Sequence, residues 1–81
     1  MATKNNDFSY YLNLHWTYTI EQGADEKNKK IYIVRVNELP GVVTDAPNIQ
    51  EAMERIKDAM LGAFRLYKKH GEEIPEPINV R

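Results

Sequence analysis

The sequence predicts a single α+β domain, in which a three-stranded antiparallel meander is covered by one long helix. Three patterns predict it. Residues 10–20 alternate with period two, as a strand with one buried face does. Residues 31–36 and 42–45 are rich in β-branched side chains and lie on either side of turn-forming residues. Residues 48–70 repeat apolar side chains every three to four positions, the period of a helix. The chain has 81 residues, the length of one domain.

The first predicted strand follows a polar segment, residues 1–7, which we interpret as a disordered lead-in to a single domain over residues 8–81. One side of this strand is expected to face the core; it comprises Tyr10, Leu12, Leu14, Trp16, Tyr18 and Ile20. The other side is expected to face away from the helix; it comprises Tyr11, Asn13, His15, Thr17 and Thr19.

The second and third strands are separated by a predicted type II turn. Residues 22–30 are polar and charged, which favours an exposed hairpin loop before the second strand. Five of the six residues in 31–36 are apolar, which indicates burial on most of both faces or an added contact surface. Pro40 and Gly41 suit the two central positions of a type II turn, where proline presets φ and glycine accepts a positive φ.

The predicted helix begins after Asn48, a good N-cap, with Glu51 three residues later. It closes at Gly71, which can adopt the left-handed conformation. An extended connector over residues 72–77 then leads to a short fourth strand over residues 78–81. If that strand joins beside the first, the order β-β-β-α-β gives a sheet with strand order 3-2-1-4 and one face that no helix covers.

Composition excludes several classes of function. Eleven basic and twelve acidic residues leave no basic excess, so we expect no direct nucleic-acid binding. There is no cysteine, and two distant histidines do not suggest a metal site, so neither a metal nor a cofactor is expected. We find no apolar run of membrane-spanning length and no signal peptide, and expect a cytoplasmic protein without membrane contact. A core this thin favours a homo-oligomer.

No group of residues predicts catalysis. Glu51, Glu54 and Asp58 share one side of the helix, as an acid–base or metal cluster would, but they also suit an ordinary solvated surface. His15 has no neighbouring nucleophile motif. Gly62 lies on the polar side of the helix interior, where either close approach of another chain or chance would explain it. We therefore expect no enzyme.

Several segments, in the same order and spacing, together resemble the HicB-type antitoxin family across roughly residues 9–77. They are Tyr11-Leu12-Asn13-Leu14, the segment from Glu38 through Leu39-Pro40-Gly41 to Thr44, Asn48 to Ala52 with Ala59-Met60, and Gly71 through Ile74-Pro75-Glu76-Pro77. The resemblance implies a partial RNase H-like fold without nuclease activity. It also implies a small RNA-cleaving partner, a HicA-like toxin, whose active site the antitoxin masks. Many such antitoxins carry a C-terminal DNA-binding module, and since the sequence ends at Arg81 we expect a stand-alone HicB-like domain.

The resulting hypothesis is an antitoxin-type binding module that neutralises a toxin by stoichiometric occlusion. Glu21, Asp25, Glu26 and Glu38 would complement a basic partner. The predicted partner-binding residues are Tyr11, Asn13 and His15, on the uncovered side of the first strand. The alternative is an orphan HicB-like oligomeric scaffold or small-ligand binder that has no toxin partner. An RNase H-like nuclease would instead require the helix carboxylates to act on RNA.

Overall fold

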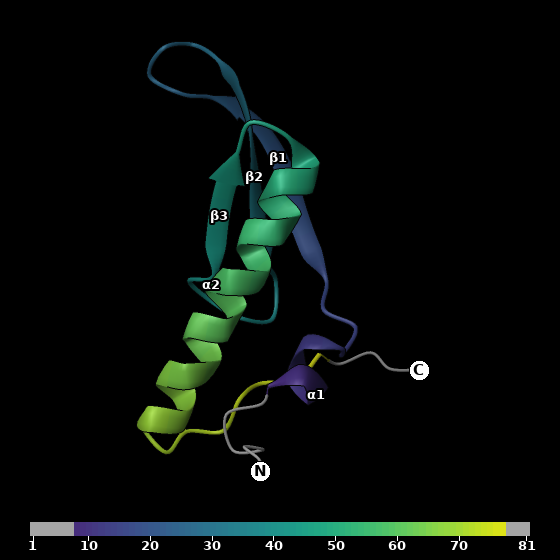
Figure 1. The fold of residues 1–81 in the computed structure, drawn as a ribbon, viewed down its shortest axis with the longest axis vertical. Coiled ribbons are helices and arrows are strands. Elements are labelled where there is room, and N and C mark those ends of the chain that lie inside the picture. The colour runs from purple at the N-terminus through teal and green to yellow at the C-terminus, as the bar shows by residue number, and fades with distance from the viewer. Residues whose placement is uncertain (1–7, 78–81) are drawn as a thin grey trace.

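The computed structural model describes residues 8–77 and has three strands and two helices (Figure 1). In chain order these are α1 (Ser9–Leu12), β1 (Tyr18–Ala24), β2 (Lys30–Val36), β3 (Val43–Ala46) and α2 (Ile49–Lys69). The α+β class and the antiparallel meander are confirmed, with strand order β1-β2-β3. The arrangement is compatible with a partial RNase H-like fold. The predicted lead-in over residues 1–7 and the fourth strand over residues 78–81 lie outside the described residues.

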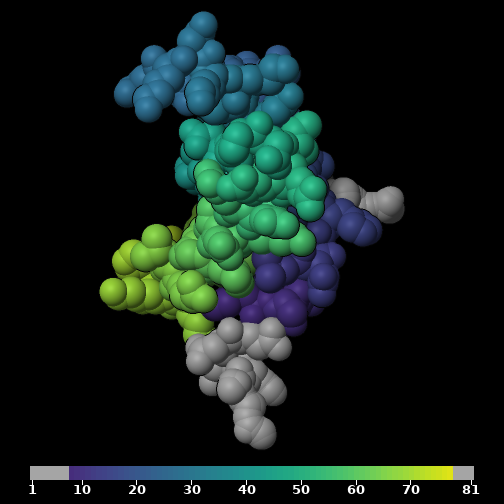
Figure 2. Space-filling view, turned by 45° about the horizontal axis from the view of Figure 1, so that its top comes forward, coloured from purple at the N-terminus to yellow at the C-terminus, as the bar shows by residue number. Residues whose placement is uncertain are grey.

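Both connections in the sheet are fixed by local hydrogen bonds. In the β1–β2 hairpin, the Asp25 Oδ1 accepts from the N–H groups of Lys27 (2.9 Å) and Lys29 (2.8 Å). The hairpin loop projects beyond the body of the molecule (Figures 1 and 2). Between β2 and β3, the Val42 N–H donates to the Leu39 carbonyl at 3.1 Å. Gly41 has φ = 85°, as a type II turn requires at that position, so this predicted turn is confirmed.

The long helix α2 begins and ends as the sequence predicts. The Asn48 side chain accepts a hydrogen bond from the Glu51 N–H at 2.8 Å, which satisfies one of the free donors of the first turn. Gly71 follows the helix with φ = 68°. Ala52, Ile56, Met60 and Phe64 form the buried stripe. This stripe packs against β2 and β3, where Val34, Val36 and Ala46 are buried.

The predicted first strand is wrong over its N-terminal half. Residues 9–12 form one helical turn, in which the Leu12 N–H donates to the Phe8 carbonyl at 2.9 Å and the Asn13 N–H donates to the Ser9 carbonyl at 3.0 Å. Strand β1 begins only at Tyr18. The third strand is also displaced by one residue from the predicted range 42–45.

The reason for this difference is the length of α2. Its 21 residues span roughly 31 Å, whereas the seven residues of β2 span roughly 23 Å. The C-terminal part of α2 therefore extends past the sheet, and the apolar side chain of Phe64 needs another cover. The N-terminal segment supplies it: the ring of Phe64 lies 5.7 Å from Phe8, 5.6 Å from Tyr11 and 6.0 Å from Trp16, measured between ring centroids.

The fold of residues 11–16 is stabilised by a hydrogen bond that an extended strand could not make. The Trp16 Nε1–H donates to the Tyr11 carbonyl at 2.7 Å, which requires the chain to fold back over the four intervening residues. Burying the indole ring with its N–H bonded is favourable, since an unpaired buried donor costs about 1–3 kcal/mol. Tertiary packing thus outweighs the period-two pattern of this segment.

Candidate protein-interaction surface

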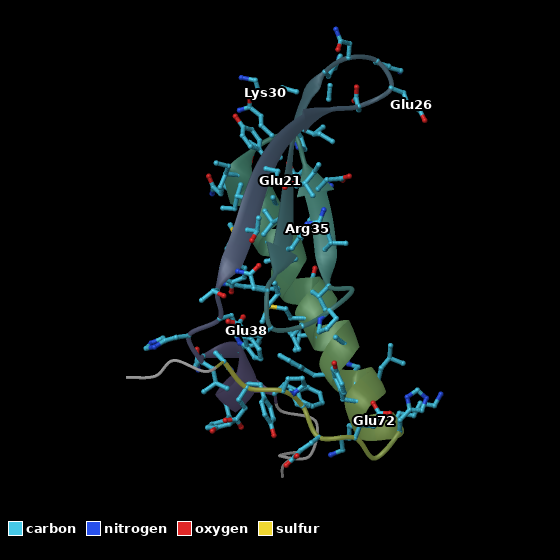
Figure 3. All side chains as sticks on the ribbon, turned by 180° about the vertical axis from the view of Figure 1, so that it is seen from behind. Glu21, Glu26, Lys30, Arg35, Glu38 and Glu72 are labelled. Carbon is cyan, nitrogen blue, oxygen red and sulfur yellow. The ribbon has the colours of Figure 1, made fainter. Side chains whose placement is uncertain are left out.

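One face of the sheet is left uncovered by the described part of the chain. Val34, Val36 and Ala46 point toward α2, so the alternate residues of each strand point the other way. Seen from behind, the sheet lies in front of α2, with Glu21 and Arg35 on the near side (Figure 3). We call this surface the open face. It consists of Thr19, Glu21, Gly23, Ile31, Ile33, Arg35, Val43 and Asp45.

The centre of the open face is apolar. Ile31 and Ile33 follow one another on this side of β2 and are both partly buried. Gly23 lies opposite Ile31 on β1, and a Cβ atom at Gly23 would lie 3.4 Å from the Cδ1 of Ile33. The side chain of Ile33 therefore occupies the space above the glycine, where an added Cβ atom would be in contact with it. Val43 extends the apolar area to the edge of β3, where it is 44% exposed.

Charges of both signs lie around this apolar centre. Arg35 and Glu21 form an ion pair of 3.9 Å between Nη2 and Oε1, with both side chains about half exposed. Such an exposed pair adds little to stability. Asp45 occupies the β3 side of the same face and is exposed. A partner that covers the open face would meet an apolar strip with polar groups on both sides.

A hydrogen-bonded network closes the lower end of the sheet, where β1 begins and β2 ends. The Glu38 carboxylate accepts from the Thr17 N–H (3.0 Å) and from the Thr17 hydroxyl (2.7 Å). The Thr19 hydroxyl donates to the Asn37 Oδ1 at 2.7 Å, and the Asn37 amide donates to the Thr17 hydroxyl at 3.0 Å. This network ties the two strands together beside the turn that leads to β3.

The network also changes the protonation of two groups. Burial alone would raise the pKa of Glu38, but the hydrogen bonds from Thr17 outweigh it and lower the pKa below 4.5. The pKa of Tyr18 is raised, first by burial of the phenol and second by the negative charge of Glu38. Glu38 is therefore a carboxylate held in place by its neighbours, which suits a structural role.

The predicted partner-binding residues do not lie on the open face. Tyr11 is in α1, half-buried against Phe64. Asn13 caps the C-terminus of α1 and His15 follows it in the loop, both exposed. Their placement on a strand is wrong because residues 9–12 are helical and β1 begins only at Tyr18. Their role in binding stays a prediction. In the sequence, the open-face residues of β2 were indicated only by the apolar side chains on both sides of that strand.

Three of the four acidic residues considered as partner contacts have bonding partners within the chain. Asp25 holds the hairpin turn, Glu38 is bonded to Thr17, and Glu21 pairs with Arg35. Among the helix carboxylates, Glu51 accepts from Arg55 at 2.7 Å. The described residues contain no group of histidine, cysteine, aspartate or glutamate side chains that could hold a metal ion.

Comparisons with known proteins identify relatives. The chain is 38% identical to the UPF0150 protein Ta0767 of Thermoplasma acidophilum over 58 residues, which is 72% of this chain and 81% of that protein. It is 41% identical over 46 residues to the protein named Antitoxin HicB of Escherichia coli K12, and equally to that of strain O157:H7. That match covers 57% of this chain but only 33% of the length of either antitoxin.

No family model matches the chain, and no solved structure matches it. None of the helices in residues 8–77 is long and apolar enough to cross a membrane. The match to Ta0767 extends over most of both proteins, and the HicB matches agree with the motifs that resemble that family. The chain therefore belongs to the UPF0150 family of HicB-like proteins.

Proposed function

We propose that this chain is an antitoxin-type binding module that neutralises a small RNA-cleaving toxin by stoichiometric occlusion. The support from sequence is its similarity to two proteins named Antitoxin HicB. On this proposal the partner is a HicA-like toxin, and the module acts in the cytoplasm over residues 8–81 without catalysing a reaction. Binding removes the toxin's catalytic surface from solvent, so no bond in either protein needs to change.

The observation that carries the proposal is the open face. A preformed sheet with one side uncovered offers a rigid surface, and a rigid surface loses little conformational entropy when a partner docks. Ile31 and Ile33 would be desolvated at the centre of the contact, where apolar anchors contribute most of the affinity. Glu21 and Arg35 would orient the partner at the rim through charge complementarity.

The test is neutralisation and binding of the toxin encoded by a neighbouring gene. Cells that express the toxin should grow when the intact chain is co-expressed, and purified toxin should bind the chain with one-to-one stoichiometry in a calorimetric titration. Ile33→Lys places a charge at the centre of the open face and should weaken binding by at least about tenfold, which corresponds to about 1.4 kcal/mol.

A matched control separates the open face from a general effect of the substitution. Ile49→Lys makes the same chemical change on α2, where Ile49 is 45% exposed and lies outside the open face. It should leave toxin binding unchanged. Asn13→Ala with His15→Ala tests the residues predicted from sequence. If that double variant loses toxin binding while Ile33→Lys keeps it, the surface is the N-terminal segment and the open-face assignment is wrong.

A further inference from the structure

The outer edge of β1 presents a row of backbone groups that face away from the sheet. Just before β1, the Asn37 N–H donates to the Thr17 carbonyl at 2.9 Å. Just after it, the Asp25 N–H donates to the Lys29 carbonyl, also at 2.9 Å. Because successive residues of a strand alternate, these bonds direct the odd-numbered residues of β1 toward β2. The residues whose N–H and carbonyl groups point outward are Tyr18, Ile20, Gln22 and Ala24. Within residues 8–77, no other segment bonds to these groups.

The sequence of β1 does not protect this edge. Natural edge strands are commonly short, interrupted by a bulge, or supplied with lysine or proline, which discourages pairing with another chain. β1 has seven residues without lysine or proline, and its pairing with β2 continues without a bulge from Tyr18 to Ala24. The other edge strand, β3, has four residues, and the outward carbonyl of Asp45 accepts from Arg55 at 2.8 Å. β1 is therefore the longer edge and the one that lacks such protection.

The helix side of β1 is also uncovered by the described elements. α2 contacts β2 and β3 but not β1, and Figure 1 shows β1 at the side of the sheet opposite β3. Ile20 lies opposite Val34 in the sheet, yet Val34 is fully buried and Ile20 is 46% exposed. The side chain of Ile20 therefore extends past the cover of α2. A further strand at this edge would bring a side chain next to Ile20, and an apolar one would fit there.

The opposite side of β1 carries one charge, on Glu21. Its carboxylate lies 3.9 Å from the Arg35 guanidinium and its side chain is 55% exposed, so it can accept a second cation. Figure 3 shows Glu21 on the outer strand and Arg35 beside it, toward the middle of the sheet. In an antiparallel pairing at the outer edge, Glu21 would occupy a non-hydrogen-bonded position, where facing side chains are closest. A basic side chain of the added strand would complement it.

Ile20 and Glu21 together define the strand that fits this edge. It alternates an apolar side chain beside Ile20 with a basic side chain beside Glu21. A small RNA-cleaving toxin has to contact RNA phosphates, and it therefore carries basic side chains of the kind that this pattern requires. The added strand would also adjoin the open face, because the odd-numbered residues of β1 belong to both surfaces. One partner can thus contact the edge and the open face together.

We propose that the outer edge of β1 pairs with an extended strand of the toxin, which adds a strand to the sheet. Backbone hydrogen bonds to the outward groups of β1 supply affinity, and the side chains beside Ile20 and Glu21 supply specificity, as in other complexes formed by strand addition. This inference rests on the proposed function and deepens it, since it states by which contacts the toxin is held.

Amide hydrogen exchange measured by NMR tests the pairing directly. In the free chain, the outward amides of Ile20 and Gln22 should exchange quickly with solvent, whereas the amides of Thr19 and Glu21, which face β2, should be protected. Addition of the purified toxin should slow exchange at Ile20 and Gln22 by at least about tenfold, because these amides become hydrogen-bonded. Thr19 and Glu21 serve as internal controls, since they are protected in both states.

Two variants at one position separate backbone pairing from side-chain contact. Ile20→Pro removes the outward N–H and places a ring at the edge, whereas Ile20→Ala shortens the side chain and keeps the N–H. Ile20→Pro should weaken toxin binding at least about tenfold more than Ile20→Ala does, measured by calorimetric titration. Circular dichroism and thermal unfolding should show that both variants are folded, because an edge strand tolerates proline where the N–H faces solvent.

Four results would overturn the proposal. In the first, the toxin binds one-to-one while the amides of Ile20 and Gln22 exchange as in the free chain; the proposed function would then stand without this inference. In the second, folded Ile20→Pro and Ile20→Ala bind the toxin equally well. In the third, the outward amides are already protected in the free chain. Protection at every concentration would assign the edge to the chain's own predicted strand, residues 78–81, and protection that grows with concentration would assign it to a second copy. In the fourth, the intact chain does not bind the toxin, which would remove the proposed function and this inference together.

Discussion

Phe64→Ala should release the N-terminal segment from α2 and lower the free energy of unfolding by about 4 kcal/mol. The side chain of Phe64 is fully buried, and its ring contacts those of Phe8, Tyr11 and Trp16. Removing a buried phenylalanine costs about 3–5 kcal/mol, and aromatic pairs contribute about 0.5–1.5 kcal/mol each beyond their buried area. A domain of this length has a total stability of about 4–12 kcal/mol, so the loss is a large fraction of it.

Urea unfolding followed by circular dichroism and by the fluorescence of Trp16 measures this effect. Trp16 is the single tryptophan and is 6% exposed, so its emission should shift to longer wavelength when the segment leaves α2. Phe64→Leu keeps most of the volume but removes the ring, and should cost no more than about half as much. A loss below about 1.5 kcal/mol in Phe64→Ala, with Trp16 emission unchanged, would show that Phe64 does not anchor residues 8–16.

Other variants test the cap, the turn and the hydrogen-bonded network. Asn48→Ala removes the acceptor of the Glu51 N–H and should cost about 1 kcal/mol in urea unfolding, whereas Asn48→Asp should cost little. Gly41→Ala should destabilise the chain by about 1 kcal/mol or more, because Gly41 has a positive φ that alanine adopts only with strain. Gly62→Ala should instead stabilise the chain by up to about 1 kcal/mol, because alanine has the higher helix propensity and its Cβ would meet no other atom. Because the pKa of Glu38 is lowered in the folded chain, its ionised carboxylate stabilises the fold above pH 4.5, and this contribution is lost as the pH falls through the lower folded-state pKa. Glu38→Gln should therefore lose less stability than the intact chain on acidification, as measured by thermal unfolding. An acid dependence unchanged in Glu38→Gln would contradict that assignment.

Most of the fold follows from local signals in the sequence. The cap at Asn48, the glycines at 41 and 71 and the apolar stripe of α2 each specify a backbone conformation within a few residues. The prediction is wrong in residues 10–17, where the alternating pattern is equally consistent with a strand and with a folded segment whose Tyr11 and Trp16 rings reach Phe64. That choice depends on how far α2 extends past the sheet, which is a property of the assembled domain.

The candidate site was less predictable, for a related reason. Tyr11, Asn13 and His15 were assigned to an uncovered strand face because the strand was extended too far toward the N-terminus. The open face was expected, but the residues that form it depend on where each strand begins and how it is paired. Once β1 begins at Tyr18, the face consists of Thr19 and Glu21 in place of the earlier residues of the same alternation.

The aromatic cluster around Phe64 also determines how the molecule would respond to mechanical tension. Phe8 and Tyr11 near one end of the described chain contact Phe64, and Ile74 near the other end packs against the same core. Both ends of the described chain lie on the α1 side of the molecule (Figure 1). A force applied between them would peel these two segments apart, one contact at a time, before any load reached the backbone hydrogen bonds between the strands. The chain should yield at low force in an optical-tweezers experiment, and the first extension should correspond to release of these segments with the sheet and most of α2 still folded.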